Sequence, residues 1–474
     1  MLRHRLLATL CGAALVAASC AENEPDSATD STASESVDVD DTASATTDAP
    51  SASTDTTLAP TTSSATDSGA TDDDTVEAGT DSASVASELQ WAIDYIGATP
   101  GPVDGDTVKV GVAGAFDFLQ LQDDGAQVAV DFVNAQLGGV GGRPVELALC
   151  NIAAPEDGGA CAAEFANDPD VVAVLAAGAL DGTADLYAGL AGQKPVLQSA
   201  PLGIADFTTD AAPSYNAGAL GAASALGLFA LDFAPQTVAL VITDDAAGRA
   251  GQSITAPIIE GSGAELRTVF VAPTATAPEI QSALQASGAN DVDVIVSGLF
   301  EQGCIALIDA LASSGIDTVA TPLLSSSTCW GNVVQEHQAN IGAEYAWPNG
   351  WYFSWGYNPW QERLEDGTST YVAAMEAAGF GDEMFDAAAG DLTFAGVLSM
   401  VRALNAVDGD YSFEAVDAEL RGWTGPHMLQ AGPLACGQSE IFRAVCPNQI
   451  GMWQFLDGEW LDATVVDISP VLSG

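Results

Sequence analysis

"DFVNAQLGGVGGRPVEL", residues 131–147, decides the fold, because four glycines lie within five residues between two apolar segments. A dinucleotide-binding loop needs G-x-G-x-x-G after a strand and at the start of a helix, where backbone N–H groups meet the phosphate. Here the glycines follow a helix pattern and precede a strand pattern, and Pro144 is not a glycine. Residues 138–142 therefore predict a helix end and a tight turn, and no phosphate site.

The segments around this turn alternate between strand and helix patterns. Before it, "TVKVGVAGAF" (107–116) alternates as a buried strand, and Ala126, Ala129, Val130 and Val133 lie on one helix face. After it come "VELALC", "CAAEFAND", "VVAVLAAG", "ADLYAGLAGQ" and "PVLQSA", and the pattern restarts at "QTVALVITDD" (236–245). This alternation predicts an α/β fold with two halves, each built on a parallel sheet.

The N-terminus has the pattern of an export signal. Arg3 and Arg5 precede an apolar run that is too short to span a bilayer, and small residues then lead to Cys20. This boundary resembles a bacterial lipobox, with Ala17 where leucine is usual. We expect a signal peptide at 1–19 and lipidation of Cys20, which would anchor the protein to the outer face of the cell membrane. An ordinary secretory signal with an incidental cysteine is the alternative.

Residues 20–87 are rich in Ser, Thr, Ala and Asp, and no Lys or Arg lies between Arg5 and Lys109. Such a composition cannot bury enough apolar surface to offset its ordering entropy, so we expect a disordered tether. As a flexible coil it would reach about 45 Å. The folded part is expected at 88–474.

Six cysteines remain in the mature chain, and they form three couples whose members are close in sequence. An even number of cysteines in an exported protein predicts disulfides. The expected pairs are Cys150–Cys161, Cys304–Cys329 and Cys436–Cys446. None has CxxC spacing, and only His337 and His427 follow the signal, so no metal site or cofactor is predicted.

The formal charge is −54, from 11 Lys plus Arg and 65 Asp plus Glu. This balance argues against nucleic acid and against anionic membrane surfaces as partners. It favours neutral, zwitterionic or cationic ligands.

The stretch 130–151, the cysteine pair and "NDPDVVAVLAAG" resemble extracytoplasmic solute-binding proteins of the branched-chain amino-acid-binding family, with the type I periplasmic-binding fold. The resemblance continues through "KPVLQSAP", "VALVITDDAAG", "GWYFSWGYNP" and "GMWQFLDGEWL". It implies two lobes joined by three crossovers. The expected first lobe is about 107–213 and 352–450, and the second about 214–351 and 451–470.

In an open α/β sheet, ligands bind at the carboxyl ends of the strands, where helix N-termini offer donors. A ligand carboxylate would meet N–H and hydroxyl groups there, and its ammonium would need an acidic or carbonyl partner. The first-lobe candidates follow two strands, and they are Asp181, Gly182, Thr183, Ser199 and Ala200. Thr183 has an equally simple role as a helix N-cap.

The second lobe offers Ala247, where the family often has an aromatic residue, and the stretch Phe300, Glu301 and Gln302. Either Phe300 or Glu301 is expected to face the ligand, because neighbours in an extended chain point oppositely. Asp391 is a candidate ammonium partner, although most acidic residues are simply solvated. The aromatic residues of 349–360 are expected mainly to pack at the lobe junction.

The sequence bears on three classes of function: a binding protein for transport, a sensory lipoprotein and an enzyme. The resemblance, the signal and the tether favour a binding protein for an amino acid, Leu, Ile or Val above all, that delivers its ligand to the permease of an ABC transporter. Amides or urea-like compounds would also fit, and a sensory lipoprotein could use the same fold. For an enzyme, the chain offers no G-x-S-x-G elbow, no paired histidines and no free mature cysteine, so none is expected.

Overall fold

The computed structural model describes residues 81–117, 121–341, 347–355, 367–381, 384, 390–428, 432–461 and 463–474. The expected signal peptide, Cys20 and the tether up to residue 80 lie outside the described residues. Residues 81–87, expected in the tether, belong to helix α1 (Asp81–Ile96).

The first sheet has four parallel strands in the order β2-β1-β3-β4. They are β1 (Val108–Gly114), β2 (Val145–Asn151), β3 (Val171–Gly178) and β4 (Val196–Gln198). The predicted strands and their parallel pairing are confirmed.

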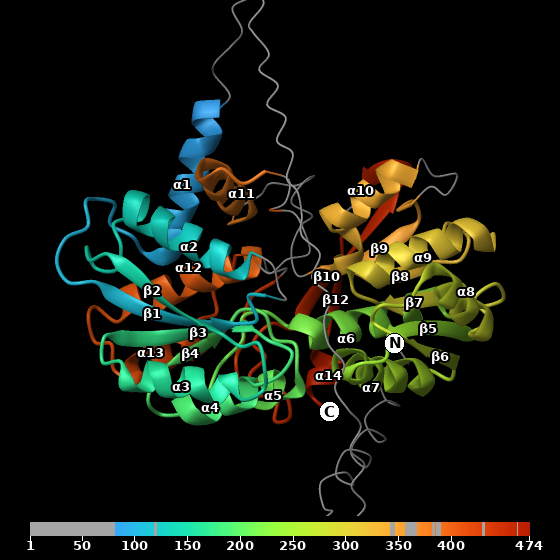
Figure 1. The fold of residues 1–474 in the computed structure, drawn as a ribbon, viewed down its shortest axis with the longest axis horizontal. Helices are drawn as coiled ribbons and strands as arrows, with labels where there is room; N and C mark the ends of the chain where they lie inside the picture. Colours follow the sequence, from blue (N-terminus) through green and yellow to red (C-terminus); the bar gives the residue numbers. More distant parts are fainter. Residues whose placement is uncertain are drawn as a thin grey trace, which may run out of the picture. The chain divides into compact units, whose positions relative to one another are not determined.

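Helices cover both faces of this sheet, as Figure 1 shows. One face carries α1, α2 (Gln122–Phe132), α11 (Gly367–Ala378) and α12 (Gly390–Ala406). The other carries α3 (Asp157–Asn167) and α4 (Thr183–Leu190), while α5 (Ile204–Thr208) follows β4 and α13 (Phe413–Gly422) packs on α12. We call this sheet with its helices the first lobe.

The glycine-rich turn has the predicted structure. α2 continues into a π-helix at Val133–Leu137, which ends at Gly138 with φ of 80°. Gly139, Gly141 and Gly142 also have positive φ, and Val140 pairs with Arg143 just before β2 begins. These glycines therefore end a helix and lead into a strand, as the sequence predicted.

The second sheet has eight strands, in the order β11-β10-β9-β8-β7-β5-β6 with β12 on β10. Strands β5 to β9 are parallel and β10 to β12 antiparallel to their neighbours. They are β5 (Thr237–Thr243), β6 (Glu265–Val271), β7 (Val294–Gly298), β8 (Leu323–Ser326), β9 (Trp351–Trp355), β10 (Gln449–Leu456), β11 (Glu459–Trp460) and β12 (Thr464–Asp467).

This sheet is also covered on both faces, and with its helices it forms the second lobe (Figure 1). One face carries α6 (Gly218–Ala230) and α7 (Ala246–Gly261), and the other α8 (Ala277–Ala286), α9 (Glu301–Ser314) and α10 (Asn332–Ile341). The short elements are the 3-10 turns Leu231–Phe233 and Ser327–Trp330 and the final helix α14 (Ser469–Leu472).

The chain passes between the lobes three times: after α5, after β9 and before β10. Two passages are joined by backbone hydrogen bonds, from Ser214 N to Ala444 O (2.7 Å) and from Cys446 N to Ser214 O (3.1 Å). Interleaved passages of this kind make neither lobe a continuous stretch of sequence.

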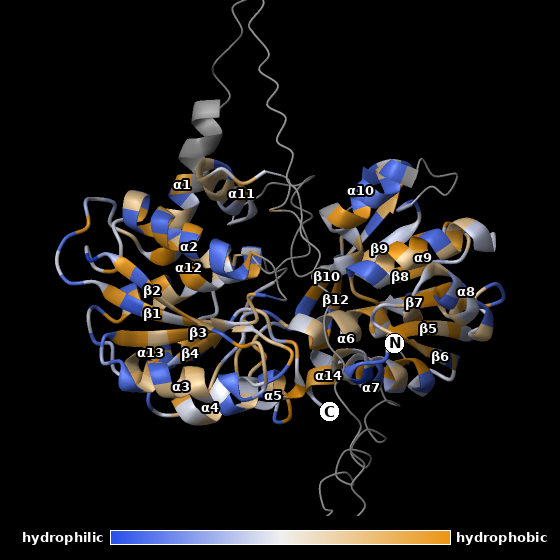
Figure 2. Ribbon diagram, viewed as in Figure 1, coloured by the Kyte–Doolittle hydropathy of each residue, from blue (hydrophilic) through white to orange (hydrophobic). Residues whose placement is uncertain are grey.

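The core consists of the strands and the inner faces of the helices, and the strands are coloured mainly as hydrophobic in Figure 2. The predicted face of α2 is confirmed, because Ala126, Ala129, Val130 and Val133 are all buried. Trp351 and Phe353 of β9 pack with Trp330 and Trp460 inside the second lobe. The rings of β9 on this face are therefore core residues.

All three predicted disulfides are present, and they are Cys150–Cys161, Cys304–Cys329 and Cys436–Cys446. Each joins residues close in sequence, so each fixes one local loop against its neighbouring helix or strand. Within the described residues, no helix is long and apolar enough to cross a membrane.

Candidate functional site

The carboxyl ends of the first-lobe strands share one edge of the sheet. Gly114 lies in register with Asn151 on one side and Gly178 on the other, and Ala176 pairs with Gln198. The loops beyond these residues are hydrogen-bonded to each other, for example from Ala115 N to Gly178 O (3.0 Å). The sheet therefore brings together the loops that the sequence predicted as first-lobe ligand contacts.

The loop between β3 and α4 carries three of the predicted residues. Gly182 is the N-cap of α4, with φ of 84°, and Thr183 is the first helical residue. The expectation that Thr183 could be the N-cap is therefore wrong, because the glycine takes that position and offers no side chain. Thr183 is 5% exposed, whereas Asp181 and Leu180 are exposed.

Glycines allow this loop to pack closely. A Cβ on Gly158 of α3 would lie 1.9 Å from the carbonyl oxygen of Gly182. A Cβ on Gly178, whose φ is 104°, would lie 2.3 Å from the carbonyl oxygen of Ala200. The β3–α4 and β4–α5 loops thus approach their neighbours at backbone distance.

Ser199 and Ala200 follow β4 and are nearly buried, at 5% and 4% exposure. The Ser199 Cβ lies 2.9 Å from the position that a Cβ on Gly396 of α12 would take. The Ser199 hydroxyl is buried and has no hydrogen-bond partner among the described residues. A buried hydroxyl without a hydrogen-bond partner destabilises the protein. A ligand or a water that bonds to the Ser199 hydroxyl would remove this cost.

Asp206 in α5 lies beside the predicted loops and is not among the residues that the sequence singled out. Its Oδ2 accepts hydrogen bonds from Leu202 N (2.9 Å) and Gly203 N (2.8 Å), and the Tyr187 hydroxyl donates to its Oδ1 (2.8 Å). Asp206 is 1% exposed. Burial, and then the Asp206 carboxylate, raise the pKa of Tyr187 well above its usual value of 10. The available signal was an acidic residue three positions after Gly203, the pattern of a capping box.

Gln122, the first residue of α2, was also missed. Its Nε2 donates to Ala177 O (2.6 Å) and Gly178 O (3.2 Å), while its Oε1 is buried without a partner among the described residues. A Cβ on Gly114 would lie 2.6 Å from that oxygen. The side chain therefore spans the carboxyl ends of β1 and β3, and its oxygen can accept a donor.

Asp391 lies in the first turn of α12 and is 2% exposed. The neighbouring Gly390 packs on the start of α2, where a Cβ on Gly125 would lie 2.1 Å from its carbonyl oxygen. Because α2 starts just beyond the end of β1, Asp391 belongs to the same region of the first lobe as Gln122.

The second-lobe candidates lie at the ends of the adjacent strands β5 and β7. Ala247 is in the first turn of α7, whose N-cap Asp245 accepts a hydrogen bond from Gly248 N. Phe300 is the N-cap of α9, and Glu301 and Gln302 form its first turn. The expected alternation between Phe300 and Glu301 is therefore wrong, because β7 ends at Gly298 and the chain turns into a helix.

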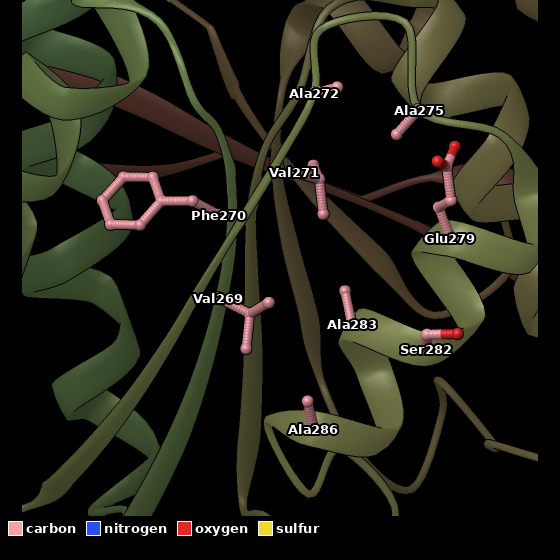
Figure 3. A pocket seen from close by; sticks show the side chains of 9 residues that line it. All are labelled: Val269, Phe270, Val271, Ala272, Ala275, Glu279, Ser282, Ala283 and Ala286. Atoms are coloured by element: carbon pink, nitrogen blue, oxygen red, sulfur yellow. The ribbon is translucent and has the colours of Figure 1, made fainter.

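A cavity of about 370 Å³ lies between β6 and α8, away from every predicted site residue. Figure 3 shows Val269, Val271 and Ala283 lining it, while the ring of Phe270 points to the other side of the strand. The Glu279 carboxylate at its rim accepts hydrogen bonds from Thr276 N (2.7 Å) and Oγ1 (2.8 Å). Apart from Glu279 and Ser282, the residues that line it are apolar.

Among the described residues, no group of three or more His, Cys, Asp or Glu side chains is arranged to hold a metal ion. The six cysteines that could bind one are in disulfides.

Residues 107–436 match the family model described as periplasmic binding protein. No curated protein sequence matches the chain closely enough to count as a relative.

Several solved structures share the fold at low sequence identity. A leucine-binding protein from Thermotoga maritima is 15% identical, covers 76% of this chain and 99% of its own, and has a TM-score of 0.58. A solute-binding protein of an ABC transporter from R. palustris, in complex with 4-hydroxybenzoate, is 16% identical, with coverages of 76% and 96% and a TM-score of 0.61. A fatty acid ABC transporter substrate-binding protein from Thermomonospora curvata is 17% identical, with coverages of 79% and 96% and a TM-score of 0.61.

Since the family model covers most of the folded part, the expected fold and family are confirmed, and membership implies an extracytoplasmic location. The chain belongs to the periplasmic binding protein family and is a solute-binding protein with the type I periplasmic-binding fold.

Proposed function

We propose that the protein captures a small neutral or zwitterionic solute with an apolar part, in the size class of a branched-chain amino acid or its amide, for an ABC importer. The observation that carries the proposal is the Ser199 hydroxyl, buried without a partner among the described residues on the loop after β4. It lies beside the β3–α4 loop, at the sheet edge where α/β proteins bind ligands.

Every predicted ligand residue except the exposed Asp181 has a role in this proposal. Gly182 N–H, the Thr183 hydroxyl, Ser199 and Ala200 N–H are the first-lobe hydrogen-bonding groups. In the second lobe, Phe300, Glu301 and Gln302 would close over the ligand, and Ala247 leaves room where a larger side chain would stand. Asp391 would receive a ligand cation.

The apolar part of the ligand has a surface to meet. Leu180 and Ile204 are exposed by 41% and 58%, although both side chains are apolar. Leu180 lies between β3 and α4, and Ile204 begins α5; the two segments are close, because a Cβ on Gly203 would be 3.9 Å from the carbonyl oxygen of Leu180. An exposed apolar pair at this edge supports a ligand that carries hydrocarbon.

Differential scanning fluorimetry with a panel of amino acids, amides and small aromatic acids tests the proposal. A true ligand at a hundredfold excess over its dissociation constant adds about 2.7 kcal/mol of stability and raises the melting temperature. Ser199→Ala should reduce the rise in melting temperature that the ligand causes. Ser253→Ala, on the exposed side of α7, should leave that rise unchanged. No shift with any member of the panel would contradict the proposal.

We further propose that Cys20 is lipidated and holds the protein at the outer face of the membrane, next to the permease. The sequence boundary at residues 17–20 supports this. Intact-mass spectrometry of the mature protein should show the added lipid, and Cys20→Ser should release the protein into the medium. An unmodified N-terminus would contradict the anchor without touching the solute-binding proposal.

A further inference from the structure

The basic side chains of the first sheet lie at the amino ends of its strands. Lys109, the second residue of β1, pairs with Asp168 (3.0 Å). Lys194, just before β4, donates to Asp168 O (2.9 Å) and Val171 O (2.5 Å). Arg143, just before β2, donates to the carbonyl oxygens of residues 106 and 107. These cations are therefore held at the edge opposite to the candidate site.

The carboxyl edge carries acids instead. Acidic residues come after every strand of the first sheet, and they are Asp117 after β1, Glu156 and Asp157 after β2, Asp181 after β3 and, in α5, Asp206 after β4. Asp157 accepts hydrogen bonds from Ala153 N (3.0 Å) and Ala154 N (2.8 Å), so it occupies the loop amides after β2. Among the described residues, no lysine or arginine directly follows a strand at this edge.

Asp206 is the buried member of this set, and its carboxylate takes two backbone amides of the β4–α5 connection. Leu202 N and Gly203 N both donate to it, and so does the hydroxyl of Tyr187. Tyr187 is one turn after Thr183 on α4, so this internal carboxylate lies next to both the β3–α4 and the β4–α5 loops. Little solvent reaches it, and charges interact more strongly where water is excluded.

Arginines elsewhere near the loops do not neutralise it. Arg443 pairs with Asp210 (2.9 Å) and also donates to Thr208 O. In the second lobe, Arg249 is paired with Asp244 just after β5 and lies over the ring of Phe270. Each of these cations already has its own carboxylate.

We propose, resting on the proposed function, that Asp206 is a specificity-determining residue and that the protein selects solutes without a free carboxylate. The preferred ligand then has an apolar body, which contacts Leu180 and Ile204, and a polar head that is an amide or a cation. A ligand carboxylate at these loops would lie near a buried like charge, which disfavours it. A zwitterionic amino acid would bind more weakly than its amide.

Isothermal titration calorimetry with matched acid and amide pairs tests this inference on the full mature protein. The probes are L-leucine with L-leucinamide, and 4-methylpentanoate with 4-methylpentanamide. We expect each amide to bind at least tenfold more tightly than its acid. Acids that bind as tightly as, or more tightly than, their amides would overturn the inference and leave the proposed function standing. No binding by any of the four probes would contradict the size class proposed for the ligand, and the inference with it.

Asp206→Asn removes the charge and keeps the shape of the side chain. We expect the acids to gain at least fivefold in affinity, while the affinity of the amides changes less than twofold. The ratio of the acid's dissociation constant to the amide's should therefore fall. Tyr187→Phe is the matched control, because it removes one hydrogen bond to Asp206 but keeps its charge, and it should leave the ratio unchanged. A folded Asp206→Asn protein with the wild-type ratio would overturn the inference. If that variant does not fold, the wild-type acid-to-amide ratio decides.

Discussion

Gly158 in α3 and Gly182 before α4 touch through their backbones, because a Cβ on Gly158 would lie 1.9 Å from the Gly182 carbonyl oxygen. This contact holds the loop that carries Thr183 against the start of the neighbouring helix. The position of a candidate ligand loop therefore depends on a residue that has no side chain and no contact with the proposed ligand.

Gly158→Ala should destabilise the protein, because the added methyl group must displace the Gly182 carbonyl. Overpacking of this kind costs about 1–3 kcal/mol. Gly159→Ala is the matched control, since its Cβ would meet Asp185 Cβ at an ordinary 3.8 Å. In a helix that change should be neutral or stabilise by up to about 1 kcal/mol. Chemical denaturation measures both, and equal free energies of unfolding for the two variants would contradict the close contact.

Asp391→Ala should weaken the binding of a ligand that carries an ammonium group by at least about a hundredfold, because the buried cation loses its partner. Asp117→Ala is the comparison. Asp117 is exposed and accepts one hydrogen bond, from Asn151 Nδ2 (2.7 Å), so its loss should change affinity little. Calorimetry on both variants decides, and small, equal effects would mean that the ammonium site lies elsewhere.

His427 predicts a pH dependence of stability. Its Nδ1 is shielded from solvent and its ring packs on Tyr215, with the ring centres 5.3 Å apart. Burial, and to a lesser extent the charge of Arg402, lower the pKa of His427 from 6.5 to about 3. The unfolded chain therefore binds a proton that the folded protein does not, at every pH between these two values.

The stabilising contribution of neutral His427 is fully present above pH of about 6.5 and is lost as the pH falls toward about 3, by about 1.4 kcal/mol per pH unit. His427→Phe keeps an aromatic ring against Tyr215 and cannot be protonated. The free energy of unfolding of the wild type should decrease relative to that of the variant as the pH falls across this range. Parallel curves would show that His427 does not titrate differently in the folded state.

Removing the Cys150–Cys161 disulfide, with both residues changed to alanine, should lower the free energy of unfolding by about 3 kcal/mol in the chain-entropy model. The bond closes a loop of 11 residues in sequence. Urea denaturation of the variant measures the loss, and a midpoint equal to that of the oxidised wild type would show that the loop is already ordered without the bond.

The sequence predicted the strands and the disulfides because both depend on local patterns. Buried parallel strands are runs of apolar residues, and cysteines close in an exported sequence pair with each other. It failed where an element ended early: β7 stops at Gly298, so the alternation assumed for Phe300 and Glu301 does not exist. Composition likewise placed 81–87 in the tether, although the small residues there continue α1.

Asp206 and Gln122 show which part of the site local patterns cannot reveal. An acid early in a helix is an ordinary cap, and nothing in the sequence says that its neighbours are buried beside a second loop. Gln122 is recognisable only once β1 and β3 lie next to each other and their glycines leave room for its amide. Gln122 contacts residues more than fifty positions away in the sequence, and Asp206 receives a hydrogen bond from Tyr187 on the preceding helix.

Small-angle X-ray scattering with and without a saturating ligand, identified by the thermal-shift panel, tests the central claim that a solute is captured between two lobes. A ligand that contacts both lobes stabilises the closed state, so the radius of gyration should decrease on binding. The Ser199→Ala variant should require a higher ligand concentration for the same decrease in the radius of gyration. A scattering profile that a saturating ligand leaves unchanged would contradict capture by lobe closure.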